Sequence, residues 1–333
     1  MKAHLTTLST LALFLTTPLL LAAELPGPLV DTEWLAKHLN DKNLVVLDVR
    51  ADTKSFTAKS GGSPSIPGMN PCGAKKGKKP ETAGHIPGAR LWDWKTVRVK
   101  RVVNGIELIS MTPTSEAFET MVRELGVNND SAVVITADGA ETSTLTFATR
   151  VYWTFKYYGH DKVAVLNGGT VKWKAENRPM SFDPNEGLAK GNFTARAERR
   201  EMLATTADVE AAMNTKQMQL LDGRTANYYL GQEKKDYVYA KGHIPGAKNL
   251  AHTQLADDKT HAFKSMDNLK KLAADLGVST TKPTITYCDS GHLSTGQWFV
   301  LSELMGNKNV KLYDGSMHEW TKQKADTVST KME

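Results

Sequence analysis

Cys288 is the residue of this sequence best placed to do covalent chemistry. Residues 284–287 are rich in β-branched and aromatic side chains and predict a buried strand that ends at the cysteine, and residues 296–305 have the spacing of a helix. A thiol between a strand and a helix lies near backbone N–H groups and a helix dipole, which favour the thiolate. This position suits a nucleophile. The alternative is a buried structural cysteine, since unpaired cysteines are among the most buried residues.

The residues after Cys288 form a short polar loop that predicts an anion-binding site. The backbone N–H groups of residues 289–295, curled around the sulfur, would stabilise a sulfur anion, and Gly291 would allow the tight curl at little steric cost. His292 has two interpretations: it polarises a substrate or adds positive charge, or it is an exposed loop histidine that is neutral at pH 7. A phosphatase-like site would need an arginine at position 294, and the serine there excludes that function. The substrate-binding candidates in the loop are Asp289, Ser290, Gly291, His292, Leu293 and Ser294.

Length and composition indicate an ordinary soluble protein of about two domains. The chain has 333 residues, of which 40% are hydrophobic and 23% charged. Its net charge of +6 is mild and no segment interleaves aromatic and basic residues, so we expect small anionic substrates and no nucleic-acid partner. With only Cys72 and Cys288, the chain has no disulfide framework and no cysteine-rich zinc site. It also carries no nucleotide-phosphate motif, and we therefore expect no cofactor and no metal.

The first 23 residues have the pattern of a secretory signal peptide. A short basic start precedes an apolar run at residues 11–21, which ends in Ala22-Ala23. An uncleaved anchor is the alternative, but about 14 apolar-leaning residues are short for a membrane span. We expect cleavage near Ala23, a periplasmic or secreted protein, and no stable membrane insertion after cleavage. An oxidising compartment would allow Cys72 and Cys288 to pair, although no feature of the sequence brings them together.

An internal repeat divides the chain into two similar halves. The hexapeptide Gly-His-Ile-Pro-Gly-Ala occurs at residues 84–89 and again at 242–247. In each half it follows a strand that ends in an acid and an arginine, at residues 44–50 and 219–224. Strands then alternate with helices in the same order in both halves. This alternation predicts an α/β fold with two domains, each a parallel sheet flanked by helices on both faces.

The two predicted domains differ in length and in chemistry. We predict an N-terminal domain at residues 24–175, a linker at 176–204 and a C-terminal domain at 205–333. An insertion in the N-terminal domain, at about residues 51–83, is rich in Gly, Pro and Lys and predicts a surface loop; a basic flap beside the substrate is the alternative. At the strand end the N-terminal copy has Ala137-Asp138 in place of a thiol. We therefore expect the C-terminal domain to be the catalytic one.

These motifs resemble the tandem-domain rhodaneses, the sulfurtransferases of the thiosulfate and 3-mercaptopyruvate type. Residues 239–250 match the first signature of that family, and residues 310–320 match the second, except that Met317 replaces an aromatic residue. The resemblance covers nearly the whole chain after the signal peptide. It implies that Cys288 forms a persulfide at a site between the two domains, and that the N-terminal domain is non-catalytic.

The resemblance also implies a reaction. Arg224 matches an arginine that would bind the substrate anion, because a guanidinium fits an oxyanion with two hydrogen bonds; a salt bridge to Asp222 is the alternative. The expected reaction moves a sulfane sulfur from thiosulfate or a similar donor to cyanide or a thiol. The alternatives are 3-mercaptopyruvate as the donor, and a non-catalytic or persulfide-carrier interaction protein. Thiosulfate enzymes of this family usually have basic residues after the cysteine, whereas this sequence has Asp289. The identity of the sulfur donor therefore stays open.

Overall fold

The computed structural model describes residues 23–59 and 83–332. Residues 1–22 of the predicted signal peptide, most of the predicted insertion, and Cys72 lie outside these ranges, so what the sequence implies for them stays a prediction. Within the described ranges, no helix has the length and apolar character needed to cross a bilayer.

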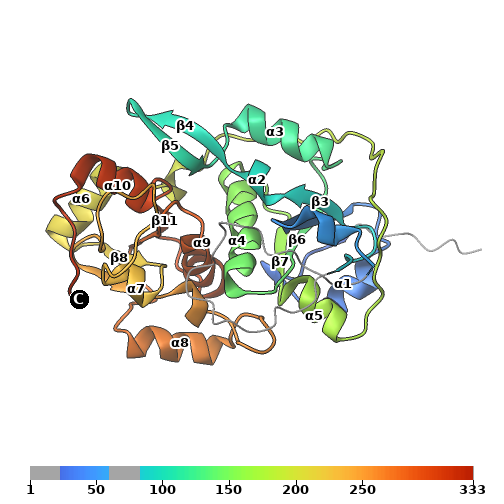
Figure 1. The fold of residues 1–333 in the computed structure, drawn as a ribbon. Helices are drawn as coiled ribbons and strands as arrows, with labels where there is room; N and C mark the ends of the chain where they lie inside the picture. The colour runs from blue at the N-terminus through green and yellow to red at the C-terminus, as the bar shows by residue number, and fades with distance from the viewer. Residues whose placement is uncertain (1–22, 60–82, 333) are drawn as a thin grey trace, which may run out of the picture.

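The N-terminal half is built on a five-stranded parallel sheet (Figure 1). Its hydrogen-bonded order is β1 (Leu29–Val30), β7 (Val163–Leu166), β6 (Ala132–Ala137), β2 (Leu44–Arg50) and β3 (Arg90–Asp93). Alternate side chains of a strand point to opposite faces, and here both faces are apolar and covered. The helices on one face are α1 (Thr32–His38) and α5 (Gly169–Ala175), and those on the other are α3 (Ser115–Glu124) and α4 (Thr142–Tyr157).

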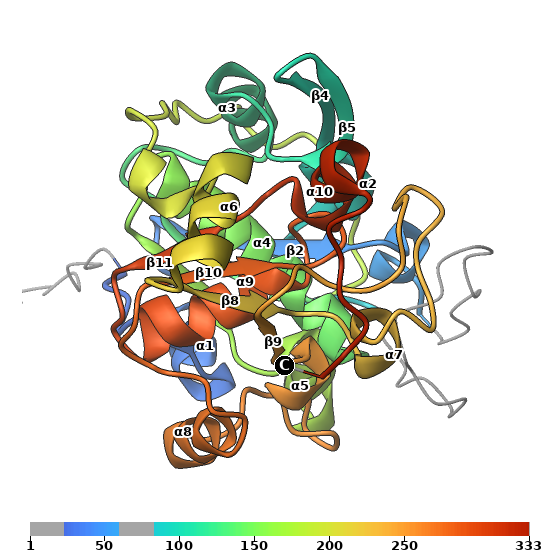
Figure 2. The ribbon, with the colours of Figure 1, turned by 90° about the vertical axis from the view of Figure 1, so that its left-hand side faces the viewer.

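The C-terminal half repeats this plan on a four-stranded parallel sheet. Its order is β11 (Val310–Leu312), β10 (Thr284–Tyr287), β8 (Gln219–Asp222) and β9 (Ala247–Asn249). Figure 2 shows α6 (Thr206–Thr215) and α10 (Ser316–Lys324) on one face and α8 (Met266–Asp275) on the other, where α9 (Ser294–Trp298) also packs. The predicted α/β fold, with a parallel sheet and helices on both faces in each half, is confirmed.

The helix after the Cys288 loop differs in detail from the prediction. We predicted a helix over residues 296–305, whereas α9 begins at Ser294 and continues as a π-helix over Phe299–Leu304. The π-helix is a wider form that is frequent near functional sites. Among the shorter elements, α2 (Trp94–Val97) and α7 (Ala226–Tyr229) follow β3 and β8 respectively.

The two halves share one hydrophobic core. A single cluster of buried side chains extends across both halves. It includes the sheet face under α3 and α4 in the N-terminal half and the sheet face under α8 and α9 in the C-terminal half. In the middle of the molecule α4 packs directly against α9 (Figure 1). Because α9 begins where the Cys288 loop ends, this packing places the loop against the N-terminal half.

An antiparallel hairpin, absent from the predicted elements, makes a second connection between the halves. It consists of β4 (Val99–Val103) and β5 (Ile106–Met111). Its turn is Asn104-Gly105, and both residues have the positive φ of a two-residue hairpin turn, 51° and 79°. An Asn-Gly pair between β-branched residues is a strong hairpin signal, so this element was predictable. The hairpin reaches α10, where Lys322 Nζ donates a hydrogen bond to the Glu107 carbonyl over 2.7 Å.

Candidate functional site

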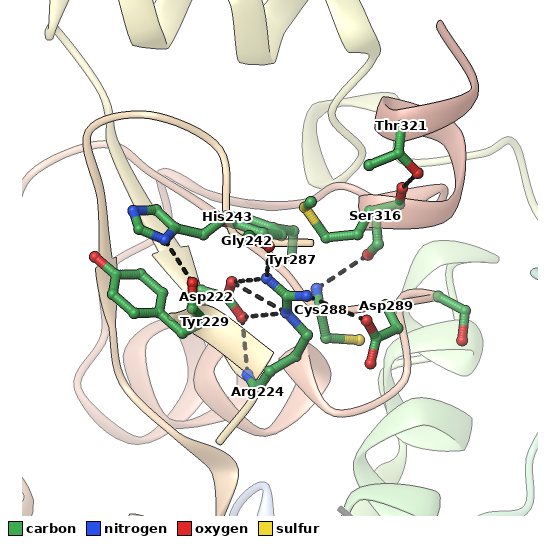
Figure 3. Close-up of polar contacts among 12 residues, drawn as sticks. Asp222, Arg224, Tyr229, Gly242, His243, Tyr287, Cys288, Asp289, Ser316 and Thr321 are labelled. Carbon is green, nitrogen blue, oxygen red and sulfur yellow. Dashed lines mark hydrogen bonds and ion pairs between the residues drawn. The ribbon is translucent and has the colours of Figure 1, made fainter. Parts of the chain in front are cut away.

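Cys288 lies directly after β10, a strand with a neighbour on each side in the C-terminal sheet. The residue is 1% exposed. Ser316 Oγ accepts a hydrogen bond from the N–H of Cys288 over 3.1 Å (Figure 3). It also accepts one from the N–H of Gly291 over 2.9 Å and donates one to the Tyr313 carbonyl over 2.8 Å. One hydroxyl group therefore fixes both the residue that carries the thiol and the turn that follows it.

The N–H groups of the loop are only partly free to bind an anion. Gly291 N–H donates to Ser316, and Thr295 N–H donates to the His292 carbonyl over 3.1 Å. The prediction that every N–H from 289 to 295 binds the anion is therefore too broad. In the described part of the chain, the loop N–H groups without an acceptor are those of Asp289, Ser290, His292, Leu293 and Ser294. Such unpaired N–H groups are the donors that a sulfur anion needs.

The shape of the loop requires glycine at position 291. Gly291 has a φ of +65°, and a Cβ there would lie 2.5 Å from Asp314 Oδ1 and 2.6 Å from the Asp314 carbonyl oxygen. Asp314 is itself held by the N-terminal half. Its Oδ2 accepts a hydrogen bond from Thr112 N–H over 2.8 Å, and its Oδ1 lies 2.6 Å from Arg150 Nη1. The loop thus packs on a carboxylate whose position depends on both halves.

Arg224, predicted to bind the substrate anion, is buried and its guanidinium is already occupied (Figure 3). It contacts both carboxylate oxygens of Asp222, with Nη2 2.5 Å from Oδ2, and donates to the Gly242 carbonyl over 2.8 Å. Its Nη1 lies 3.3 Å from Asp289 Oδ1. A guanidinium with two carboxylate partners and no exposure has little capacity left for a substrate. The geometry favours the alternative, a salt bridge to Asp222, and the ligand role of Arg224 stays a prediction.

The same arginine explains how an acid can follow the cysteine. Asp289 is 3% exposed, and burial raises the pKa of its carboxyl above the ordinary value, although the charge of Arg224 opposes this rise. Burial lowers the pKa of Arg224, but the charges of Asp222 and Asp289 outweigh burial and leave that pKa above its ordinary value. The negative charge of Asp289 is therefore balanced inside the C-terminal half.

His292 is not the exposed loop histidine of the sequence-based alternative. Its Nε2 lies 2.7 Å from Thr146 Oγ1 on α4, and its ring centroid lies 4.6 Å from that of Trp94 and 5.0 Å from that of Phe147. Burial, followed by the charges of nearby arginines, lowers the pKa of His292 well below its ordinary value. A neutral imidazole at pH 7 follows, and this argues against the interpretation in which His292 adds positive charge. Its contacts assign it to anchoring the loop on the N-terminal half.

The remaining predicted loop residues are also buried around the turn. Ser290 Oγ lies 3.5 Å from the hydroxyl of Tyr237. Leu293 is 7% exposed and Ser294 is fully buried. Ser294 Oγ has no hydrogen-bond partner among the described residues. The structure thus brings the predicted loop residues together on one turn after Cys288.

The N-terminal half contributes residues that the sequence analysis did not single out. Arg150 on α4 is fully buried, and its Nη1 donates to the Gly291 carbonyl over 2.9 Å. The preceding residue, Thr149, has its Oγ1 2.8 Å from Thr295 Oγ1. A signal for Arg150 was available, because an arginine inside an apolar helical segment is almost never buried unless it is paired.

The N-terminal half repeats the strand end without a thiol. Asp138 follows β6 as Cys288 follows β10. The Asp138 carbonyl accepts a hydrogen bond from Val171 N–H over 2.9 Å, and the Cys288 carbonyl accepts one from Met317 N–H over 3.0 Å. Burial raises the pKa of the Asp138 carboxyl. Over residues 23–59 and 83–332, no three His, Cys, Asp or Glu side chains are grouped as metal ligands would be.

Comparisons with known proteins agree with the repeat and the fold. The rhodanese-like domain family matches residues 31–176 and 205–323. A protein of Mycolicibacterium smegmatis named "Putative thiosulfate sulfurtransferase" is 32% identical over 298 residues, which cover 88% of this chain and 94% of the relative. The "Sulfur carrier protein TtuD" of Thermus thermophilus is 32% identical over 307 residues, or 89% of this chain and 94% of the relative. The crystal structure of SseA from Escherichia coli, a 3-mercaptopyruvate sulfotransferase, is 28% identical with a TM-score of 0.66 and covers 87% of this chain and 98% of that one.

Proposed function

Because the chain belongs to the rhodanese-like family of sulfurtransferases, we propose that it carries a sulfane sulfur on Cys288 as a persulfide. The observation that supports this proposal is the position of the thiol. Cys288 follows a central strand, and the loop after it has N–H groups without an acceptor in the described part of the chain. Thiolate and persulfide are both anions, and donors that are already in place stabilise an anion without reorganising.

The reaction would proceed in two steps through the covalent intermediate. In the first, the Cys288 thiolate attacks the outer sulfur of a donor such as thiosulfate. A bond forms between Sγ and that sulfur, the sulfur–sulfur bond of the donor breaks, and its electron pair leaves with sulfite. In the second, cyanide or a thiolate takes the outer sulfur of the persulfide, and the electron pair of the broken bond restores the Cys288 thiolate.

We propose thiosulfate as the donor, with 3-mercaptopyruvate as the alternative. Asp289 would repel a dianion, but its charge is paired with Arg224, which reduces this objection. The similarity to proteins named thiosulfate sulfurtransferase supports thiosulfate, and the similarity to SseA supports the alternative. With 3-mercaptopyruvate, the thiol sulfur would pass to Sγ and pyruvate would leave after carbon takes up the thiol proton.

Mass spectrometry of the purified protein after incubation with each donor tests the proposal. We expect a gain of one sulfur atom that maps to Cys288 and is lost in Cys288→Ser. The other cysteine provides the matched control, since Cys72→Ser should gain the sulfur as the wild type does. The donor that loads the wild type faster identifies the substrate. If neither donor adds sulfur to Cys288, the enzymatic function is wrong.

A persulfide carrier is the second candidate, and the similarity to TtuD supports it. A carrier would receive its sulfur from a partner protein. Protein isolated from its own cells with sulfur already on Cys288, yet loaded by neither donor afterwards, would favour this candidate.

We also propose that residues 1–23 direct export to the periplasm or out of the cell. The short basic start and the apolar run that follows it support this proposal. Sequencing the N-terminus of the mature protein should place it near Glu24. A mature chain that keeps Met1 would contradict cleavage.

A further inference from the structure

We propose that Arg98, which comes from the N-terminal half, binds the oxyanion of the sulfur donor beside Cys288. The inference rests on the proposed function and names the side chain that recognises its substrate. A donor with a sulfonate or carboxylate group needs a cation near the thiol. The two fully buried arginines around the loop do not meet this need, because Arg224 is paired with Asp222 and Arg150 with Asp314.

Arg98 lies on an aromatic cluster that touches the Cys288 loop. It follows α2 and precedes β4, on the segment that leads into the hairpin. The guanidinium lies over the ring of Trp94, with Arg98 Cζ 4.1 Å from the ring centroid. Trp94 in turn stacks on Phe147 at 3.9 Å and contacts the loop residue His292 at 4.6 Å, both measured between ring centroids. The cation is thus linked to the loop through the ring of Trp94.

The guanidinium of Arg98 has no counter-ion among the described residues. Its Nε is buried without a hydrogen-bond partner, and no hydrogen bond or ion pair of the described residues involves the side chain. The residue is only partly buried, so the rest of the guanidinium keeps some access to solvent. Proteins rarely hold a desolvated cation unpaired, because the lost hydration is not replaced. An anion brought by a ligand would replace it.

Several titratable groups that act on Arg98 belong to the candidate site or lie close to it. Burial, followed by the charge of Arg150, lowers the pKa of Arg98 to about 10. Tyr237, Cys288 and Asp314 oppose this shift and raise the pKa of Arg98. All three of these groups belong to the C-terminal half. The guanidinium stays protonated at pH 7, and its charge favours a bound anion.

The ligand class that follows is a small molecule with an oxyanion at one end and a transferable sulfur at the other. Thiosulfate and 3-mercaptopyruvate share this chemistry, with a sulfonate-like group in one and a carboxylate in the other. A planar guanidinium fork can hold either through two N–H groups, which a lysine ammonium reproduces only as a point charge. The half of the molecule without a cysteine at the strand end would therefore supply the cation for the donor.

Steady-state kinetics of Arg98→Gln test the inference. We expect the KM for the donor to rise roughly 10- to 100-fold, the size of a lost charge-assisted hydrogen bond, with a smaller change in kcat. Arg98→Lys keeps the charge and should recover part of the loss. The matched control is Arg178→Gln, because Arg178 also lies over a tryptophan of the N-terminal half, Trp173 at 5.4 Å, but pairs with Glu176. Its KM should equal that of the wild type.

Alkylation of Cys288 gives a measurement that does not depend on sulfur transfer. Mass spectrometry would follow the rates at which anionic iodoacetate and neutral iodoacetamide modify Cys288. We expect the ratio of the two rates to fall roughly tenfold in Arg98→Gln and to stay constant in Arg178→Gln. Both reagents meet the same thiolate, so the ratio removes any change in the reactivity of the thiol itself.

The two measurements separate the inference from the proposed function. If donors load Cys288 while KM and the alkylation ratio of Arg98→Gln both match the wild type, the inference is overturned and the function stands. If no donor loads Cys288 but the ratio falls in Arg98→Gln, the proposed function fails and the anion site beside the thiol is upheld.

Discussion

Ser316 is the residue whose replacement tests the geometry of the Cys288 loop most directly. Its Oγ accepts hydrogen bonds from the buried N–H groups of Cys288 and Gly291. In Ser316→Ala both donors lose their acceptor, and each unsatisfied buried group costs about 1–3 kcal/mol. We therefore expect the free energy of unfolding to fall by about 2–6 kcal/mol. The turn after the thiol loses its support at the same time, so the rate of persulfide formation should fall as well.

A glycine at position 316 would add a stabilising effect, because it removes backbone strain. The φ of Ser316 is 51°, a left-handed conformation that costs a residue with a side chain about 1–2 kcal/mol. Ser316→Gly loses the same two hydrogen bonds but relieves this strain. It should therefore be more stable than Ser316→Ala by roughly 1 kcal/mol.

Urea unfolding followed by tryptophan fluorescence would measure the three stabilities, and timed mass spectrometry of Cys288 with the donor would measure the loading rates. If Ser316→Ala were as stable as the wild type, the two hydrogen bonds would not support the loop as argued. If Ser316→Ala were more stable than Ser316→Gly, the argument from backbone strain would be wrong.

Two further predictions concern titratable groups. His292→Gln keeps a hydrogen-bonding group beside Thr146. It should leave the shape of the pH profile of persulfide formation unchanged between about pH 6 and 8, because burial lowers the pKa of His292 well below that range. A titration step that is present in the wild type and absent from this variant would contradict a neutral His292. For Glu176, burial raises the pKa, but hydrogen bonds from Lys172, Thr32 and Arg178 outweigh burial and hold it at about 2. A carboxyl whose pKa is lower in the folded state stabilises the fold above its unfolded pKa, about 4.3, and loses this contribution as the pH falls toward 2. In urea titrations the wild type should exceed Glu176→Gln in stability at about pH 6 and match it near pH 2, and a difference that grows as the pH falls would refute this assignment.

The fold was predictable from the sequence because it depends on local patterns that occur twice. Strand and helix periodicities, with the repeated hexapeptide, identified a parallel sheet in each half and placed Cys288 at the end of a strand. The roles of Arg224 and His292 were not predictable in the same way. Arg224 contacts a carboxylate 65 positions away, Asp289, and His292 contacts a hydroxyl 146 positions away, Thr146. Only the folded chain brings such partners together, and their contact leaves no periodicity in the sequence.

The N-terminal half has no cysteine at the strand end, yet its contacts argue against a passive role. Three residues of α4 hold the loop and the first turn of α9 from outside, namely Thr146, Thr149 and Arg150. Since α4 also packs on α9, removing the N-terminal half would expose the apolar face of that helix and leave His292 and the Gly291 carbonyl without these partners. The contacts from α4 therefore add to those from Ser316 in holding the loop. One copy of the repeat therefore carries Cys288, and the other determines the shape of the loop around it.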